Sequence, residues 1–466
     1  MNDSTNNPVT NNLSNRREFL KTTGKLAAAS ALAGMTLPHV HAAENNTIQI
    51  ALIGCGGRGA GAANNALSIN KGPIKLVAMA DVFEHRLADA YNALSSAHPA
   101  TVDVPKERQF IGFDGYQKAM DCLKPGDIAI FTTPLAFRWV HFTYAIQKNL
   151  NVFMEKPLTA DGPTSRRMLK LAEAASEKNL KVGVGLMSRH SRAFQELQKR
   201  IEDGEIGEIN LMRGYRMAGP LAACFTDKWP GGTPTELLWQ ISKFHSFIWA
   251  SGGLYSDFYI HHIDHLCMMK GAWPVKVQTI GGRHYRGDNV DQNFDSYAAE
   301  YTFGDGAKMY MDGRCVTGCK DIYSSYAHGS KGMAIVASAG DCGLPSSTHR
   351  GQNPTHSNTI WTSKVAPGEQ DPYINEWNDL MDAIRNDKPY NEVKRGVQAS
   401  LVTSMGRMSA HTGQEITYEQ MLKSDHELAP GVDKMTMDSP PPLVSGPDGK
   451  YPIPQPGIVT DREYQV

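Results

Sequence analysis

Residues 48–81 combine an apolar strand, a glycine-rich turn and a helical stretch, and this order restricts the fold more than any other feature. The strand 48–53 runs directly into Gly54-Cys55-Gly56-Gly57-Arg58-Gly59. In a turn of the G-x-G-x-x-G form, the first glycine permits the sharp bend, the second lets the backbone approach a pyrophosphate, and the third lets helix and strand pack closely. The free N–H groups at the start of the following helix face the phosphates. The turn therefore predicts a dinucleotide site in a parallel, doubly wound sheet.

The residue that ends the next strand predicts which dinucleotide binds. Asp81 follows the strand 75–80, and its separation from Gly59 is close to the roughly 20 residues expected of a carboxylate that binds the adenosine ribose. A carboxylate there repels a 2′-phosphate, so the predicted cofactor is NAD rather than NADP. Arg58 or Arg86 could weaken this preference. The alternative, a chance glycine turn, is disfavoured because strand, helix, strand and acid occur in order.

The first 42 residues resemble an export signal instead of a folded segment. Arg16-Arg17 is followed by Phe19-Leu20-Lys21, a weakly apolar stretch over 26–37, and a small-residue cleavage site ending at Ala42. The apolar stretch is shorter than the roughly 20 residues of a membrane span. We expect a twin-arginine signal over 1–42 and a periplasmic or otherwise exported mature chain. A tail with a chance arginine pair is the alternative.

The bulk composition limits the partners of the chain. With 466 residues it is long enough for two or three domains, and its formal net charge of −1 provides no field that attracts nucleic acid or an anionic membrane. We therefore expect a small-molecule ligand, no nucleic acid and no membrane span. The seven cysteines are an odd number. Cys315 and Cys319 could pack, form a local disulfide or share a metal, and the metal is the least favoured of these.

Hydrophobic patterning divides the rest of the chain into three parts. From 43 to 190, short strands alternate with helices, which is typical of a Rossmann domain with a doubly wound parallel sheet. From 191 to 424, strand-like segments alternate apolar and polar residues, which predicts an α+β domain with an open, largely antiparallel sheet. From 425 to 466 proline is dense, so this tail is expected to be loose or to extend as an arm over a partner subunit. The open sheet face and the arm favour a dimer or tetramer.

Polar residues follow two of the predicted strands, at the edge where open α/β sheets bind ligands. Thr133-Pro134 comes after the strand 127–132, and Glu155-Lys156-Pro157 comes after the strand 151–154. A lysine near the nicotinamide could exchange a proton with a substrate hydroxyl. The alternative for Glu155 and Lys156 is a surface ion pair.

A second group of ionisable residues lies in an apolar helix predicted over 252–270. Asp257 and His261 are four residues apart, so they share a helix face, and a carboxylate beside a histidine orients it and makes it more basic. Asp264 could hold His261 from the other side. A metal site is disfavoured, because one helix cannot supply a closed set of ligands. A structural role is the alternative, and for His262 it is preferred.

Together these motifs resemble the Gfo/Idh/MocA oxidoreductases, a family that includes glucose–fructose oxidoreductase and inositol dehydrogenases. The resemblance covers about 48–420 and rests on the turn 54–59, Thr133-Pro134, Glu155-Lys156-Pro157, the segment 204–207, the pair Asp257 and His261, and the segment 329–332. It implies a Rossmann domain followed by an α/β domain on an open sheet. It also implies hydride exchange between NAD(P) and a carbinol carbon, usually of a sugar or polyol.

By position in these motifs, the resemblance implies roles for individual residues. Lys156 would bind the reacting hydroxyl, His261 would take or return its proton, and Asp257 would position the substrate and His261. Glu155 would contact the nicotinamide side of the cofactor, which Thr133-Pro134 would flank. Relatives often carry a histidine where this chain has Arg138, which leaves the cofactor contact at that position open. Further candidates for substrate contacts are Arg189, Trp239, Tyr255 and His262.

These features predict an exported NAD-dependent oxidoreductase acting on a sugar or glycoside. Since little free NAD exists outside the cytoplasm, we expect the cofactor to be held tightly and regenerated within the catalytic cycle. One alternative is an NAD-dependent glycosidase, for example on N-acetylhexosaminides, in which oxidation, elimination, hydration and re-reduction cleave the glycosidic bond. The retained Lys156 favours the oxidoreductase. Another alternative is a binding protein that keeps NAD structurally and turns nothing over.

Overall fold

A computed structural model describes residues 46–284 and 286–464 of the chain. The predicted export signal over 1–42 lies outside the described residues. Among the residues that the structure does describe, no helix combines the length and apolar character needed to cross a membrane.

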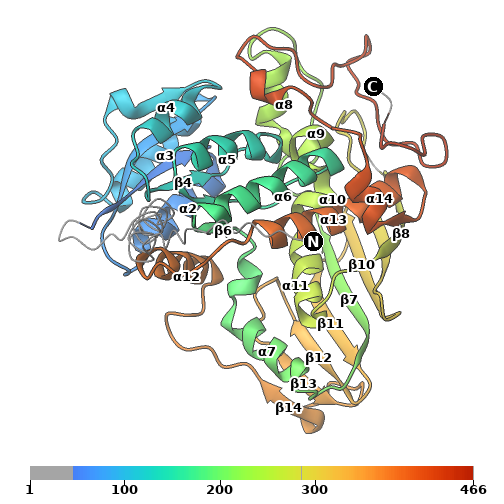
Figure 1. The fold of residues 1–466 in the computed structure, drawn as a ribbon. Coiled ribbons are helices and arrows are strands. Elements are labelled where there is room, and N and C mark those ends of the chain that lie inside the picture. The colour runs from blue at the N-terminus through green and yellow to red at the C-terminus, as the bar shows by residue number, and fades with distance from the viewer. Residues whose placement is uncertain (1–45, 285, 465–466) are drawn as a thin grey trace, which may run out of the picture. The chain divides into compact units, whose positions relative to one another are not determined.

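The first sheet has six parallel strands in the order β3-β2-β1-β4-β5-β6 (Figure 1). They are β1 (Ile48–Ile53), β2 (Ile74–Asp81), β3 (Gln109–Ile111), β4 (Ile128–Phe131), β5 (Asn151–Met154) and β6 (Val182–Val184). The central strands are short apolar runs, as expected of a sheet with helices on both faces. Strand order reverses between β1 and β4, so their carboxyl ends open onto the crevice where such sheets bind ligands. The predicted doubly wound sheet is confirmed.

The helices that follow these strands are α2 (Gly57–Ser68), α3 (Glu84–Ala97), α4 (Gly115–Asp121), α5 (Arg138–Gln147) and α6 (Gly162–Glu177). A helix from much later in the chain, α12 (Pro372–Arg385), also packs on this sheet, next to α2 (Figure 1). Its Trp377 is fully buried and stacks on Phe153 of β5, with the ring centroids 4.5 Å apart. The first layer is therefore completed by residues beyond 190, and the boundaries expected at 190 and 424 stay predictions.

The second sheet has nine strands in the order β14-β13-β12-β11-β7-β10-β9-β8-β15. They are β7 (Ile209–Ala218), β8 (Lys276–Gly282), β9 (Ser296–Thr302), β10 (Lys308–Cys315), β11 (Ile322–Gly329), β12 (Gly332–Ala337), β13 (Ser347–Arg350), β14 (Thr359–Thr362) and β15 (Ile416–Thr417). Neighbouring strands run antiparallel except β7 and β10, which are parallel. The predicted open, largely antiparallel sheet is confirmed, and it gains β11, β13, β14 and β15, which the sequence did not indicate.

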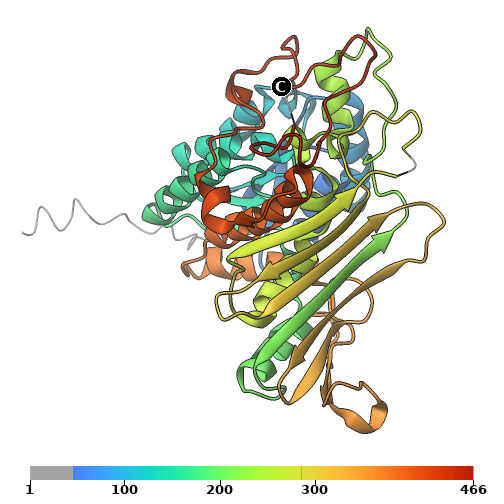
Figure 2. The same ribbon diagram turned by 90° about the vertical axis from the view of Figure 1, so that its right-hand side faces the viewer.

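Helices cover one face of this second sheet. They include α11 (Ile260–Lys270) and α13 (Val393–Thr412), and α13 also packs against α6 of the first layer. Figure 2 shows the opposite face without a covering helix among the described residues. The remaining helices are α7 (Arg192–Glu202), α8 (Glu236–Ser242), α9 (Ile248–Ser251), α10 (Gly253–Phe258) and α14 (Tyr418–Lys423). Short 3-10 turns occur at η1 (Lys106–Arg108), η2 (Leu135–Phe137), η3 (Met187–His190), η4 (Phe244–Ser246), η5 (His356–Asn358) and η6 (Val432–Lys434). The single helix expected over 252–270 is thus two, α10 and α11.

The proline-rich tail differs from the loose or partner-covering arm expected from the sequence. Its described residues, 425–464, pack on the body of their own chain, and Leu443, Tyr451 and Tyr464 are buried there. The carboxylate of Glu463 is buried against Arg407 of α13, at 2.7 and 2.8 Å. Proline density excludes regular helix and strand, but it does not prevent alternate apolar side chains from docking into a groove.

All seven cysteines are free in the structure. Cys315 is buried and Cys319 is exposed, so the local disulfide considered for this pair is not formed. Cys315 instead donates from its sulfur to the backbone carbonyl of Gly219 at 3.1 Å.

Candidate active site

A cavity of about 730 Å³ lies at the carboxyl ends of β1, β2, β4 and β5. It brings together, from positions up to two hundred residues apart, nearly all the residues that the sequence predicted for the cofactor and the chemistry. Those that line it are Gly54, Cys55, Gly56, Gly57, Arg58, Gly59, Asp81, Thr133, Pro134, Arg138, Glu155, Lys156, Asp257 and His261.

The glycine turn has the geometry of a phosphate cradle. Gly54 has a φ of +95°, a conformation that favours glycine. A Cβ on Gly59 would overlap the carbonyl oxygen of Gly54, whereas a Cβ on Gly56 or Gly57 would meet nothing within 4 Å. The open space beside Gly56 lies on the cavity side of the turn, at the start of α2. These observations fit a pyrophosphate held by backbone N–H groups.

Asp81 connects the glycine turn to the next helix. Its carboxylate accepts hydrogen bonds from the backbone N–H of Cys55 at 2.6 Å and of Phe83 at 2.9 Å. Burial raises the pKa of this carboxyl, and these hydrogen bonds oppose the rise. The side chain also lines the cavity, where a ribose hydroxyl could reach it.

The two arginines that could favour a 2′-phosphate already have partners. Arg58 donates from Nε to Glu155 at 2.5 Å, and its guanidinium lies 4.7 Å from the ring centroid of Tyr373. Arg86 donates to the backbone carbonyl of Ser242 at 3.1 Å. Arg58 is thus ion-paired, whereas Arg86 contacts a backbone carbonyl, lies 4.7 Å from the centroid of the Phe83 ring, and places a positive charge near Asp81.

Arg138 supports the turn after β4. It is 2% exposed and donates to the backbone carbonyls of Phe131 at 2.6 Å and Thr133 at 3.0 Å. Burial lowers the pKa of Arg138 to about 10. The side chain lines the cavity, yet its hydrogen bonds are to backbone carbonyls, so in this structure it holds the Thr133-Pro134 segment in place.

Lys156 and Glu155 do not form the surface pair considered as an alternative. Glu155 is buried and pairs with Arg58, while the Lys156 ammonium donates to the backbone carbonyl of Asp257 at 2.6 Å and lies 3.3 Å from its carboxylate. Burial opposes ionisation of Asp257, but Lys156 and His245 outweigh it and lower the pKa of that carboxyl. Lys156 is therefore fixed at the cavity wall by its two contacts with Asp257.

His261 lies on the same wall, but its surroundings differ from those predicted. The Asp257 carboxylate contacts Lys156 and His245, and Asp264 pairs with Arg189, so neither aspartate holds His261. Only Tyr259 separates α10 from α11, and its backbone stays in the right-handed helical region. Burial first, and the Lys156 charge second, lower the pKa of His261 to about 4. Its imidazole is neutral near pH 7 and able to accept a proton.

His245 is a site residue that sequence reasoning did not single out. Its Nε2 lies 3.1 Å from the carboxylate of Asp257, and its ring stacks on Phe258 with centroids 5.5 Å apart. In the sequence it was one of several aromatic residues over 218–250, and no spacing linked it to Asp257. The contact depends on η4 packing beside α10.

One part of the cavity wall carries three further polar residues without a signal in the sequence: Arg216 on β7, Asp341 and Tyr373. The Arg216 guanidinium lies 3.7 Å from the centroid of the Tyr323 ring, and its Nε and Nη1 are buried with no hydrogen-bond partner among the described residues. Burial lowers the pKa of Arg216, and Asp341 opposes this. This wall can donate to hydroxyl or carbonyl oxygens of a polar ligand.

Four residues proposed for substrate contacts do not line the cavity. For Arg189 the reason is its ion pair with the buried Asp264, whose carboxylate it contacts at 2.8 to 3.0 Å. For Tyr255 the reason is burial within the core, where its hydroxyl lies 3.0 Å from that of Tyr301. Both side chains hold the second layer together.

Trp239 and His262 are the other two. Trp239 is buried between Phe247 and Tyr451, at centroid distances of 5.6 and 6.4 Å. It therefore packs against the C-terminal tail, to which Tyr451 belongs, and not against a sugar ring. His262 is fully buried 4.9 Å from the Tyr323 ring, and burial lowers its pKa well below the ordinary value. The structural role preferred for His262 fits this position.

The comparisons with known proteins point to one family. A family model described as the GFO/IDH/MocA C-terminal domain matches residues 194–335. An inositol 2-dehydrogenase of Rhizobium meliloti (strain 1021) is 26% identical over 231 residues, which cover 50% of this chain and 57% of that protein. A scyllo-inositol 2-dehydrogenase (NAD(+)) of Bacillus subtilis (strain 168) is 30% identical over 162 residues, or 34% of this chain and 39% of that protein. The chain thus matches less than two thirds of these curated relatives' own lengths.

A solved structure extends the likeness over most of the fold. The scyllo-inositol dehydrogenase of Lactobacillus casei, solved with bound NAD(H) and scyllo-inositol, superposes with a TM-score of 0.58 at 21% identity. The match covers 80% of this chain and 99% of that one. The family model supports the resemblance to the Gfo/Idh/MocA oxidoreductases that the motifs predicted, and the solved structure shows that the fold is shared.

Proposed function

We propose, from this family resemblance and the cavity, that the chain is an NAD-dependent oxidoreductase acting on a carbinol carbon of a sugar, glycoside or polyol. One observation carries the proposal. The dinucleotide cradle at Gly54–Gly59 and the proton-handling group formed by Lys156, Asp257 and His261 line one continuous cavity. A binding protein that only stored NAD would have no need of a lysine and a neutral histidine at the same wall.

The choice of cofactor is supported from two directions. The names of the Bacillus subtilis relative and the Lactobacillus casei structure include NAD. In this chain, Asp81 lines the cavity and Arg58 is ion-paired with Glu155, which disfavours a 2′-phosphate. When bound, NAD supplies a hydride acceptor and donor at its nicotinamide ring.

The residues of the chain would handle binding and the proton. Asp257 holds the Lys156 ammonium, leaving its remaining N–H groups to donate to the reacting hydroxyl oxygen. A positive charge there favours loss of the hydroxyl proton, and the neutral imidazole of His261 would accept it. His245 supports Asp257 from the other side. In the reverse direction His261 returns the proton to the oxygen.

The first experiment asks whether the cofactor is present. Purified protein is denatured, and the supernatant is assayed for NAD and NADP. The proposal expects NAD in near-equimolar amount, or saturable uptake by protein that was purified without it. Folded protein that neither contains nor takes up a pyridine nucleotide would refute the proposal.

A second experiment distinguishes the net reactions. The protein is incubated separately with free sugars and polyols and with aryl glycosides, and products are measured along with net NADH. Oxidised or interconverted sugars support the oxidoreductase, and aglycone release without net NADH supports the glycosidase. Lys156→Met should abolish either activity, whereas Lys181→Met is the matched control. Lys181 is also buried and paired, with Asp387 at 2.7 Å, but lies outside the cavity. Full activity of Lys156→Met would contradict the assignment.

We further propose that the chain is exported by the twin-arginine route and works as a dimer or tetramer. Arg16-Arg17 supports the first proposal, and Arg16→Lys with Arg17→Lys should leave the protein in the cytoplasm. The uncovered face of the second sheet supports the second proposal (Figure 2). Sedimentation of the mature protein at micromolar concentration measures its mass directly, and a monomer would contradict it.

A further inference from the structure

The C-terminal tail forms part of the wall of the cofactor cavity. We name residues 428–443 the strap. Three of its residues, Val432, Asp433 and Met435, line the same cavity as the glycine turn and Asp81. Val432 and Asp433 belong to η6, which packs beside η2, the turn that follows Thr133-Pro134. Figure 1 shows the tail passing over this end of the first layer, beside α8.

Both ends of the strap are fixed by buried hydrogen bonds. At the start, the backbone N–H of Leu428 donates to Asp161 at 3.0 Å, and Asp161 also caps α6. At the end, Gln240 of α8 donates to the backbone carbonyl of Leu443 at 2.7 Å. The strap is therefore tied at one end to the N-terminus of α6 and at the other end to α8.

Apolar contacts hold the strap down between these two ties. Val432 is buried in a cluster with Leu135, Phe137 and Val140 of the first layer and Ile241 of α8. Met435 packs at the margin of the same cluster. The buried Val432 and the partly buried Met435 therefore hold the strap against the first layer and α8.

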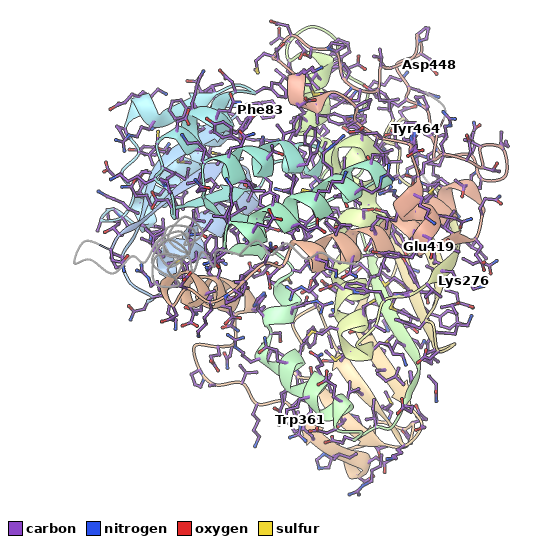
Figure 3. The ribbon with its side chains drawn as sticks, in the orientation of Figure 1. Phe83, Lys276, Trp361, Glu419, Asp448 and Tyr464 are labelled. Carbon is purple, nitrogen blue, oxygen red and sulfur yellow. The ribbon has the colours of Figure 1, made fainter. Side chains whose placement is uncertain are left out.

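The strap lies at the end of the cavity where the adenosine half of a dinucleotide would bind. Asp433 lies near Tyr116, since after burial its charge contributes to the raised pKa of that phenol. Tyr116 and Phe83 also line the cavity, next to Asp81. Figure 3 labels Phe83 and also Tyr464, which is 2% exposed and anchors the far end of the tail. A ligand bound along Asp81 would therefore be covered by the chain's own C-terminus.

We propose that the strap retains the dinucleotide by covering its adenosine half, so that the cofactor leaves slowly and stays bound between turnovers. The inference rests on the proposed function and goes beyond it, because it assigns cofactor retention to the C-terminal tail. Dissociation of the cofactor then requires the strap to move away, which breaks the apolar contacts of Val432 and Met435.

The test compares cofactor release from full-length holoenzymes. The double variant Val432→Gly/Met435→Gly lacks both side chains through which the strap packs on the apolar cluster. The matched control, Val444→Gly/Ile458→Gly, removes two exposed apolar side chains of the same tail outside the cavity. Bound NADH is displaced by excess NAD, and the fluorescence decay gives the release rate. We expect at least a tenfold faster release from the double variant and the wild-type rate from the control.

A second measurement applies if the double variant does not fold. A protease site is placed at the segment 436–441, in which exposed residues alternate with half-buried ones, and the folded holoenzyme is cut there, which leaves both anchored ends in place. The cut should accelerate NADH release at least tenfold, while a protein without the site, treated alike, keeps its rate. If wild-type protein holds NADH but cutting and the double variant both leave release unchanged, this inference is wrong and the proposed function stands. If wild-type protein binds no NAD at all, the proposed function itself fails, and this inference with it.

Discussion

The buried ion pair between Arg407 and Glu463 gives the sharpest stability prediction. The Arg407 guanidinium is fully buried, and the Glu463 side chain is 4% exposed; two hydrogen bonds of 2.7 and 2.8 Å join them. Burial opposes ionisation of Glu463, but Arg407 and His411 outweigh it and lower the pKa of that carboxyl. The substitution Glu463→Gln removes the negative charge while preserving the side-chain shape, and leaves a buried cation without its partner.

The loss of stability expected from Glu463→Gln follows from this geometry. At such distances and an effective dielectric near 20, the attraction is roughly 6 kcal/mol, partly offset by desolvation of both ions. Removing one partner of a buried pair typically costs about 3–5 kcal/mol. For a body of this size that corresponds to a melting temperature lowered by about 3 to 6 °C.

The assay is thermal unfolding followed by circular dichroism, with limited proteolysis to monitor release of the tail. Asp461→Asn is the matched control, because Asp461 pairs with Arg462 at the exposed surface two residues away. It should leave the melting temperature unchanged. Since the native pKa of Glu463 is lowered, its contribution is complete above the unfolded value of about 4.3 and shrinks as the pH falls below it. If Glu463→Gln has the same melting temperature as the wild type at pH 7, the tail is not docked through this ion pair.

Three further predictions concern the site. Burial and the Lys156 charge lower the pKa of His261 to about 4, so kcat/KM should fall only as the pH drops through about 4. If kcat/KM instead falls near pH 6.5, the ordinary histidine pKa of about 6.5 would show that His261 is not the base. Gly59→Ala should abolish cofactor binding measured by calorimetry, because the added Cβ overlaps the backbone of the turn. Gly57→Ala should retain the fold and the binding, because its Cβ meets nothing within 4 Å. Equal binding by both variants would contradict the packing of the turn. Arg216→Leu should raise KM for the substrate at least tenfold and leave the bound NAD content unchanged; an unaltered KM would exclude Arg216 from substrate binding.

Local patterns in the sequence were sufficient for most of the first layer, but they missed its edge strand β3 and the packing of α12. Strands 48–53 and 151–154 were predicted with the bounds that the structure shows, since each is a short apolar run between turn residues. The same patterns missed β11 and β13, which carry polar side chains such as Ser325 and Thr348 that hydrogen-bond or pack inside the second layer. Their place in the sheet depends on neighbouring strands and not on their own periodicity.

For the side chains of the cavity, the sequence likewise indicated the residues of the site but not the contacts that they make. Lys156, Asp257 and His261 were all predicted as site residues, because their types and positions after strands and in a helix suggest proton chemistry. Their partners were predicted wrongly: Asp257 holds Lys156, from 101 positions away, and not its near neighbour His261. Spacing within a helix identifies residues on one face, but it says nothing about a competing cation brought in by another element.

The amino-acid sequence alone determined the parallel first layer, the glycine turn and its acid, because these depend on backbone conformation and patterning within some thirty residues. Only the tertiary structure decided that Asp264 is committed to Arg189, that His245 supports Asp257, and that the proline-rich tail lies over the cavity. These contacts join segments separated by tens to hundreds of residues. Which of them form depends on the packing of whole layers, where one buried charge or apolar groove selects its partner from all the side chains that the fold brings within reach.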